Sequence, residues 1–193
     1  YNEANTIRQI LEKIRSIEID KEIIVVDDGS SDGTGKALRG LEQDSIKIIH
    51  HPTNRGKGAA VLTGLANAGS EFVIIQDADL EYDPNDYLKL VGVMQQGDVD
   101  IVLGARFTKG YHGLLIHRLG NRFLTTLLNI LFRVNLNDCF CCYKLFRRET
   151  INKLNLKCRG FDIETEIIAK ALNSKLRITE VPITYRPRSY TEG

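Results

Sequence analysis

Residues 73–83 read VIIQDADLEYD, and this stretch joins a buried strand to an acidic loop. The four apolar residues 72–75 form a run typical of a strand that is covered on both faces. Acidic side chains then follow at every second position: Asp77, Asp79, Glu81 and Asp83. Carboxylates this close repel one another, so a fold that brings them together requires a positive charge between them.

The composition indicates a globular domain with no excess of charge. The chain has 193 residues, 42% of them hydrophobic, which is enough for one compact core. It carries 26 basic and 25 acidic side chains, for a formal net charge of +1. A nucleic-acid-binding domain is usually strongly basic, so we expect no nucleic-acid partner. No apolar run reaches the roughly 20 residues of a membrane span, and no signal peptide is evident.

Strand-like and helix-like segments alternate through the first 106 residues. The predicted strands are 22–28, 46–50, 72–76 and 100–106. The predicted helices are 4–17, 33–43, 56–69 and a helix that starts at Pro84. This alternation favours right-handed βαβ units on a mostly parallel central sheet flanked by helices, which is a Rossmann-like α/β fold. Since no linker or repeat interrupts the pattern, we expect residues 1–193 to form a single domain.

The second half of the chain contains an amphipathic helix with two possible uses. This helix is predicted at 116–133, and further elements are a strand at 143–146, a helix at 162–172 and an extended segment at 176–188. Its apolar stripe consists of Leu119, Phe123, Leu127, Ile130 and Leu131, and its arginines are Arg118, Arg122 and Arg133. Packing in the core is the commoner use of such a stripe, and resting on a membrane surface is the alternative.

The four cysteines are Cys139, Cys141, Cys142 and Cys158. Three of them fall within the string CFCC, whose spacing fits a zinc site poorly. We therefore expect buried free thiols rather than a metal site or a disulfide.

Polar residues gather where the predicted strands end. They are Asp27 and Asp28, His50 and His51, Asp77 and Asp79, and Arg106. In open α/β sheets, ligands bind beyond the carboxyl ends of the strands. The sequence therefore predicts a binding site at this edge of the sheet.

The acidic loop is a candidate metal site. Asp77, Asp79 and Glu81 point the same way if the backbone stays extended. Three convergent oxygen ligands suit Mg²⁺ or Mn²⁺, which complete their coordination with substrate phosphates. The alternative is a solvated acidic loop in which Asp83 caps a helix.

Two further positions have both a functional and a structural interpretation. Lys57 starts a glycine-rich helix whose free N–H groups favour an anion, although neither Gly-Lys string is a complete P-loop; it is otherwise a surface lysine. Asp27 and Asp28 can hydrogen-bond a ribose or a base edge, or they can stabilise the turn GSSDG.

Eight motifs in order resemble the family-two inverting glycosyltransferases of GT-A fold. They are YNE (1–3), VVDDGSSDGT (25–34), NRGKGAA (54–60), QDADLEYDP (76–84), GARF (104–107), LNDCFCCYKLFRRE (136–149), GFDIETEI (160–167) and ITEVPITYRPRSYTEG (178–193). The similarity is greatest to the dolichyl- or polyprenyl-phosphate mannose and glucose synthase branch. It covers essentially the whole chain.

The resemblance implies a role for each part of the chain. Residues 1–106 are expected to bind a UDP- or GDP-hexose, and residues 107–193 the acceptor. The implied donor-binding residues are Tyr1, Glu3, Asp27, Asp28, Lys57, Asp77 and Asp79. The implied metal ligands for Mg²⁺ or Mn²⁺ are Asp77, Asp79 and Glu81, and the implied phosphate-binding arginines are Arg106, Arg118 and Arg188. Arg106 and Asp138 are the expected catalytic residues.

The expected reaction is transfer of a hexose to a polyprenyl phosphate at the cytoplasmic face of a membrane, in cell-envelope glycan biosynthesis. A phosphate acceptor is already an anion at pH 7, whereas a hydroxyl acceptor needs a general base, for which Asp138 is the candidate. Transfer to a hydroxyl of a glycan or lipid, and a non-catalytic nucleotide-sugar-binding module, remain alternatives. The sequence has no Trp, so the Q-x-x-R-W motif of processive polymerases is absent. Because the sequence starts at Tyr1 rather than Met, we expect a piece truncated at both ends, with its membrane contact through a missing C-terminal segment.

Overall fold

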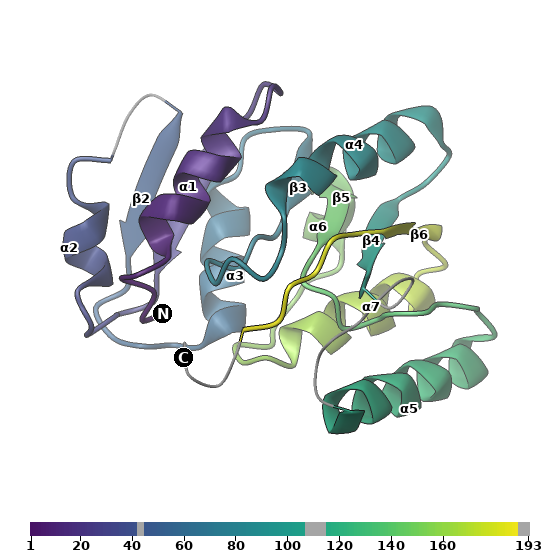
Figure 1. The fold of residues 1–193 in the computed structure, drawn as a ribbon. Coiled ribbons are helices and arrows are strands. Elements are labelled where there is room, and N and C mark those ends of the chain that lie inside the picture. The colour runs from purple at the N-terminus through teal and green to yellow at the C-terminus, as the bar shows by residue number, and fades with distance from the viewer. Residues whose placement is uncertain (42–44, 107–114, 189–193) are drawn as a thin grey trace.

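The structure is a computed structural model, which describes residues 1–41, 45–106 and 115–188, with only the backbone for 115–118. Its elements are α1 (Ile7–Ser16), β1 (Ile23–Asp27), α2 (Thr34–Leu38), β2 (Ile46–His50), α3 (Lys57–Asn67), β3 (Phe72–Ile74), the 3₁₀ turn η1 (Pro84–Asp86), α4 (Tyr87–Gln96), β4 (Ile101–Ala105), α5 (Leu115–Phe132), β5 (Lys144–Arg147), α6 (Arg148–Lys153), α7 (Ile163–Asn173) and β6 (Ile178–Pro182). The predicted α/β fold is confirmed (Figure 1).

The strands form a parallel pair and a mixed four-stranded sheet. β1 and β2 are parallel, and their register sets Asp27 opposite His50, so the two strand tips lie side by side. The second sheet has the order β3-β5-β4-β6. β4 and β6 are parallel, whereas β5 is antiparallel to both β3 and β4. Thus β3, β4 and β6 run in one direction, and the reversed β5 between them was not expected.

The helices bury the faces that their sequence periodicity indicates. α1 buries Ile7, Ile10, Leu11 and Ile14. β4 is buried along its whole length, and α7 buries an apolar face against it that includes Ile163, Ile167 and Ile168. Figure 1 shows α1 and α2 beside β2, α4 next to the mixed sheet, and α7 and α5 on the opposite side of that sheet.

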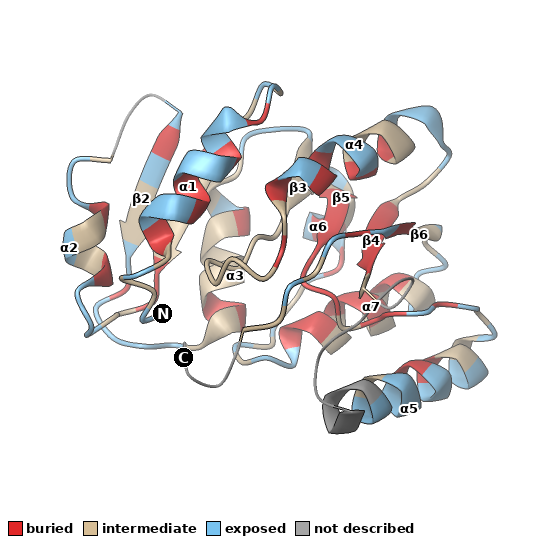
Figure 2. Ribbon diagram, viewed as in Figure 1, coloured by how far each residue is buried: buried red, intermediate tan, exposed pale blue. Residues whose placement is uncertain are grey.

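The prediction that α5 packs its apolar stripe in the core is wrong. Leu119, Phe123, Leu127, Ile130 and Leu131 are all exposed. Figure 2 shows most of α5 exposed at the edge of the molecule, beyond the buried α7. In the part of the chain that the structure describes, no helix combines the length and the hydropathy needed to cross a bilayer.

The predicted burial of the cysteines is found for three of the four. Cys139, Cys141 and Cys142 are buried and Cys158 is partly buried. Burial raises the pKa of Cys139 to about 11 and that of Cys141 to about 12, so these thiols stay protonated at neutral pH. They fill the core beside β5.

Candidate functional site

Asp28, directly after β1, is buried, and both of its carboxylate oxygens accept hydrogen bonds from the protein. Its Oδ1 lies 2.5 Å from His51 Nδ1, and its carboxylate accepts the N–H groups of Arg55 and Gly56 at 2.7–3.1 Å. The loop that leads into α3 is therefore held by Asp28. Gly56 needs to be glycine here, because its φ is +94° and a Cβ would meet the Arg159 carbonyl oxygen at 2.5 Å. The family resemblance implies that Asp28 contacts the nucleotide; in the structure its carboxylate contacts His51, Arg55 and Gly56.

Asp27 lies beside it at the same strand tip. Its carboxylate accepts the Ser30 N–H at 3.1 Å and lies 3.0 Å from His50 Nδ1 on β2. Burial alone would raise the pKa of Asp27, but the hydrogen bonds from Ser30 and His50 outweigh it and hold the pKa below its ordinary value. Asp27 therefore stays ionised and orders the first turn of the GSSDG loop.

The first residues of the chain pack on that loop. The Glu3 N–H donates to Thr34 Oγ1 at 2.8 Å and the Ala4 N–H to Asp32 Oδ2 at 3.0 Å. The Glu3 carboxylate accepts the Thr6 hydroxyl at 2.6 Å and pairs with Arg188 Nη2 at 2.5 Å. Tyr1 is 56% exposed, so its ring is open to a ligand at this edge.

The acidic loop does not have the extended backbone on which the three-carboxylate prediction depended. The chain turns at Ala78 and Asp79, and Leu80 has a φ of +63°. The turn redirects Glu81, whose carboxylate accepts the Tyr185 hydroxyl at 2.8 Å and the Arg188 N–H at 2.9 Å. Among the described residues, no three His, Cys, Asp or Glu side chains are grouped closely enough to hold a metal ion. Glu81 thus holds the C-terminal segment, while Asp83 caps η1 through the Asn85 N–H, as the alternative interpretation predicted.

Asp77 and Asp79 remain as a pair of carboxylates that suits a divalent cation. Asp79 is half-buried, and burial together with the negative charge of Asp77 raises its pKa to about 6. Two carboxylates that disfavour each other in this way are relieved by a cation between them. They are also the hard oxygen ligands that Mg²⁺ and Mn²⁺ prefer, one or two of which are enough when phosphates supply the rest.

Lys57 provides the positive charge next to this pair. Its Nζ bonds Asp77 Oδ2 at 2.9 Å and lies 3.0 Å from Glu164 Oε1, close enough for an ion pair without a well-aligned hydrogen bond. Burial disfavours the ammonium ion, but Asp77 and Glu164 contribute to a pKa above its ordinary value, so Lys57 is charged. The helix N-terminus predicted to bind an anion is partly occupied, because Gly58 and Ala59 donate their N–H groups to the carbonyls of Gly160 and Arg159.

Glu164 and Lys144 complete this network, and sequence analysis missed both. Lys144 Nζ pairs with Glu164 Oε2 and donates to the Cys141 carbonyl oxygen, and Lys144 is fully buried. The available signal was Lys144, a lysine between Tyr143 and Leu145 in a predicted strand. A charge in such a place is almost always paired. A chain of alternating charges therefore runs from the core strand β5 through α7 and α3 to the acidic loop.

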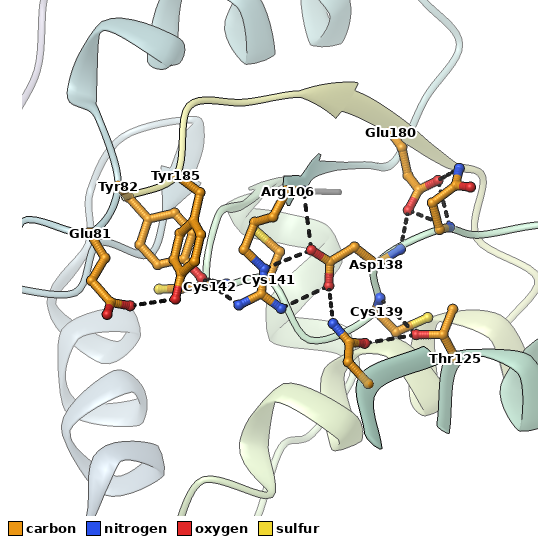
Figure 3. Close-up of polar contacts among 12 residues, drawn as sticks. Glu81, Tyr82, Arg106, Thr125, Asp138, Cys139, Cys141, Cys142, Glu180 and Tyr185 are labelled. Atoms are coloured by element: carbon orange, nitrogen blue, oxygen red, sulfur yellow. Dashed lines mark hydrogen bonds and ion pairs between the residues drawn. The ribbon is translucent and has the colours of Figure 1, made fainter. Parts of the chain in front are cut away.

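Arg106 and Asp138 form a bidentate pair beyond the tip of β4. The Arg106 Nε and Nη2 atoms donate to the two Asp138 oxygens at 2.7 and 2.9 Å, and Asn121 Nδ2 donates to Oδ1 at 2.8 Å. Asp138 is fully buried, and the Arg106 guanidinium lies 5.2 Å from the centre of the Tyr185 ring. Figure 3 shows Arg106 between the Tyr82 and Tyr185 rings on one side and Asp138 on the other. Both carboxylate oxygens of Asp138 are therefore engaged by side chains of the protein, Arg106 and Asn121.

Arg188 connects the two ends of the chain at the acidic loop. Its Nε donates to the main-chain oxygen of Asp79 at 2.8 Å, in addition to its pair with Glu3. A hollow of about 540 Å³ opens here. Its lining residues are Asn5, Thr6, Asp79, Leu80, Arg186, Pro187 and Arg188. The side chain of Arg118, the third predicted phosphate-binding arginine, lies outside the described residues.

Most of the predicted residues therefore fall into three groups, each held together by its own contacts. One is the strand tip of Asp27 and Asp28, the second contains Glu3, Lys57, Asp77, Asp79 and Arg188, and the third is the pair of Arg106 and Asp138. Glu81 joins the last two, because its partner Tyr185 stacks on Arg106.

Comparison with known proteins finds relatives among the glycosyltransferases. The family described as glycosyl transferase family 2 matches residues 1–154. Polyprenol monophosphomannose synthase of Mycolicibacterium smegmatis is 28% identical over 97% of this chain and 75% of its own length. Glycosyltransferase AglJ of Haloferax volcanii is 31% identical over 97% of this chain and 61% of its own length.

The solved structures that are similar share the fold. Glucosyl-3-phosphoglycerate synthase from Mycobacterium tuberculosis, in complex with phosphoglyceric acid, superimposes with a TM-score of 0.77 at 22% identity, covering 100% of this chain and 71% of that one. The same enzyme in complex with Mn²⁺ and UDP-glucose gives a TM-score of 0.76 at 21% identity, over 100% and 70% of the two chains. Because the family match covers residues 1–154, which is most of the chain, this chain belongs to glycosyltransferase family 2.

Proposed function

We propose that this protein is a metal-dependent inverting glycosyltransferase that transfers a hexose from a UDP- or GDP-sugar to a polyprenyl phosphate at the cytoplasmic face of a membrane. The observation that carries the proposal is the pair of Asp77 and Asp79 flanked by Lys57 and Arg188 at the edge of the strands. The similarity to polyprenol monophosphomannose synthase supports this acceptor class.

The donor nucleotide is bound by the edge that the N-terminal segment and the β1 tip form. Tyr1 and Glu3 contact it directly, and Asp27 orders the loop on which it rests. Asp28 acts indirectly in this proposal, because its oxygens hold the backbone of Arg55 and Gly56. Nucleotide and hexose selectivity then depend on the shape of this edge.

Asp77 and Asp79 are the residues that would hold Mg²⁺ or Mn²⁺. When bound, the metal would neutralise the charge that develops on the diphosphate leaving group. Lys57 and Arg188 flank the same place and stabilise that charge with their own, which assists departure of the nucleotide diphosphate. Because these cations are held by buried or main-chain partners, they are positioned before substrate arrives.

The environment of Asp138 favours a phosphate acceptor over a hydroxyl acceptor. A hydroxyl must lose its proton to a base, whereas a phosphate monoester has a second pKa of about 6 and is an anion at pH 7. The Asp138 oxygens are buried and already accept from Arg106 and Asn121. In this proposal Asp138 therefore orients Arg106 toward the acceptor phosphate, and no protein base is needed for the attack.

Transfer of radiolabelled sugar to polyprenyl phosphate, from each of several UDP- and GDP-hexoses, tests the proposal. We expect product that requires Mn²⁺ or Mg²⁺ and disappears with EDTA. Asp79→Asn should lower the rate on the order of 100-fold or more, because it removes a negative charge and weakens a metal ligand where leaving-group charge is stabilised. Asp83→Asn on the same loop is the matched control, since asparagine also caps a helix. Equal rates for Asp79→Asn and Asp83→Asn would contradict the metal assignment.

A further inference from the structure

Helix α5 contacts the protein through both polar and apolar side chains. Its inward side carries Asn121, Thr125 and Asn129, one turn apart. Asn121 bonds Asp138 and Thr125, and Asn129 bonds both the N–H and the carbonyl oxygen of Leu136 at 2.9 and 2.8 Å. Leu128 is buried on the same side, and Phe132 packs against the core, so polar and apolar side chains together attach this helix to the protein.

The outward side of α5 is apolar, and we name it the α5 apolar face. It consists of Leu119, Phe123, Leu124, Leu127, Ile130 and Leu131, whose exposed fractions range from 43% to 70%. Their spacing places them along one side of the helix. Single exposed apolar residues are ordinary, but six adjacent ones mark a surface that binds something. Figure 2 shows this helix at the edge of the molecule, where its outer side is open.

The stretch of sequence that contains α5 is basic. Between Asp100 and Asp138 the sequence contains no acidic residue. It contains five basic ones there: Arg106, Lys109, Arg118, Arg122 and Arg133. Arg122 and Arg133 are exposed at α5 itself. An apolar helix face bordered by arginine and free of acidic residues is complementary to an anionic bilayer.

The composition of the face also favours lipid over a protein partner. The residues that dominate the binding energy of protein interfaces are enriched in tryptophan, tyrosine and arginine, and leucine is under-represented among them. The α5 apolar face has only leucine, isoleucine and phenylalanine, and residues 115–133 include no tyrosine or tryptophan. Aliphatic side chains of this kind partition readily into the acyl-chain boundary of a membrane.

We propose that the α5 apolar face lies in the surface of an anionic lipid bilayer and docks the active site on it. The inference rests on the proposed function, in that a lipid phosphate is the acceptor. Asn121 on α5 bonds Asp138, and Asp138 holds Arg106. The helix that enters the bilayer surface is thus two side-chain contacts away from the arginine assigned to the acceptor phosphate.

Sedimentation with sucrose-loaded vesicles tests the docking without any reaction. The probes are vesicles of phosphatidylglycerol mixed with phosphatidylcholine, and vesicles of phosphatidylcholine alone. We expect the wild-type chain to bind the anionic vesicles at least tenfold more tightly than the triple variant Phe123→Gln, Ile130→Gln, Leu131→Gln. Binding should weaken with salt and be weaker on phosphatidylcholine, because part of it is electrostatic. Leu88→Gln, at an exposed leucine of α4, is the matched control and should bind as wild type.

Thermal unfolding tests whether the variants are folded. Because the three substituted side chains are exposed, we expect the melting temperature not to fall. Equal vesicle binding by wild type and triple variant would overturn the inference. So would a wild-type chain that forms dimers, does not bind vesicles, and becomes monomeric in the triple variant, because the face would then join two copies.

An activity measurement separates this inference from the proposed function. The triple variant should lose transfer to long-chain polyprenyl phosphate in vesicles and keep transfer to a short-chain, water-soluble analogue. Vesicle binding that depends on the α5 apolar face, with no transfer to either acceptor, would contradict the proposed function and leave the docking surface established.

Discussion

Arg188 Nε donates a hydrogen bond to the main-chain oxygen of Asp79, across 109 positions of sequence. The same guanidinium pairs with Glu3 Oε2, so one side chain fixes the acidic loop against the N-terminal segment. Burial alone would lower the pKa of Arg188, but Glu3 and other negative neighbours raise it above its ordinary value, so this charge is permanent. The loop that bears the candidate metal ligands is therefore shaped by a residue far from it in sequence.

Replacing Arg188 should loosen this corner and weaken donor binding. We expect Arg188→Ala to raise the dissociation constant for the nucleotide diphosphate about tenfold or more, as for loss of a hydrogen bond to a charged group. Arg188→Lys should recover only part of the affinity, because lysine cannot hold two partners with one planar group. Calorimetric titration with UDP and GDP in the presence of Mn²⁺ measures the effect. Arg177→Ala, before β6 and paired with Asp98 and Asp100, is the control.

The pH dependence of Asp138→Asn distinguishes the two acceptor classes. With a phosphate acceptor, the rate should rise with pH through the second ionisation of the phosphate near about pH 6, and the variant should keep this limb. The variant should be slower, because Arg106 loses an anionic partner. If Asp138 is instead the base for a hydroxyl, the variant should lose both its activity and that limb. The measurement is kcat/KM from pH 5 to 9, with urea unfolding to show that the variant is folded.

Removing one partner of the buried pair of Lys144 and Glu164 should lower the free energy of unfolding strongly, whereas replacing both should lower it little. Glu164→Gln leaves the ammonium of Lys144 buried without its anion, so we expect the free energy of unfolding to fall by about 3–5 kcal/mol. The double variant Lys144→Met, Glu164→Gln should regain most of that loss, because no unpaired charge remains. Urea unfolding measures both, and Glu149→Gln, in an exposed ion pair with Lys153, should have little effect. A double variant no more stable than Glu164→Gln would contradict this account.

Protonation of Glu166 should lower the stability of the fold in acid. Burial alone would raise its pKa, but Lys170 and the N–H groups of Cys158 and Lys157 lower it to about 2, from an ordinary 4.5. A carboxyl whose pKa is lowered by folding stabilises the protein above its unfolded pKa, and this stability disappears as pH falls from 4.5 toward 2. After solvent screening we expect about 1–2 kcal/mol. Glu166→Gln should therefore be less stable than wild type at pH 7 and nearly equal to it at pH 2, as measured by denaturant unfolding.

The fold was largely predictable because it depends on local patterns. Apolar runs gave β1, β2 and β4 within one or two residues, and helical spacing gave α1 and α7. The direction of β5 could not be predicted, because a strand of four residues carries no information about the neighbours with which it pairs.

The side of α5 that faces the protein depends on contacts distant in sequence. Periodicity identified its apolar stripe, but only the positions of Asp138 and Leu136 show that Asn121 and Asn129 are the inward residues. The same is true of the site. Asp77 and Asp79 were recognisable from their position after a strand, whereas the use of Glu81 by Tyr185 and of Asp138 by Arg106 arises from tertiary packing.

The ion pair between Glu3 and Arg188 joins the first and last described segments of the chain. A polypeptide still being synthesised holds the N-terminal partner long before its C-terminal one has left the ribosome. The edge proposed to bind the donor is therefore completed only after Arg188 has been synthesised, and a chain that stops before it would lack one of the two partners.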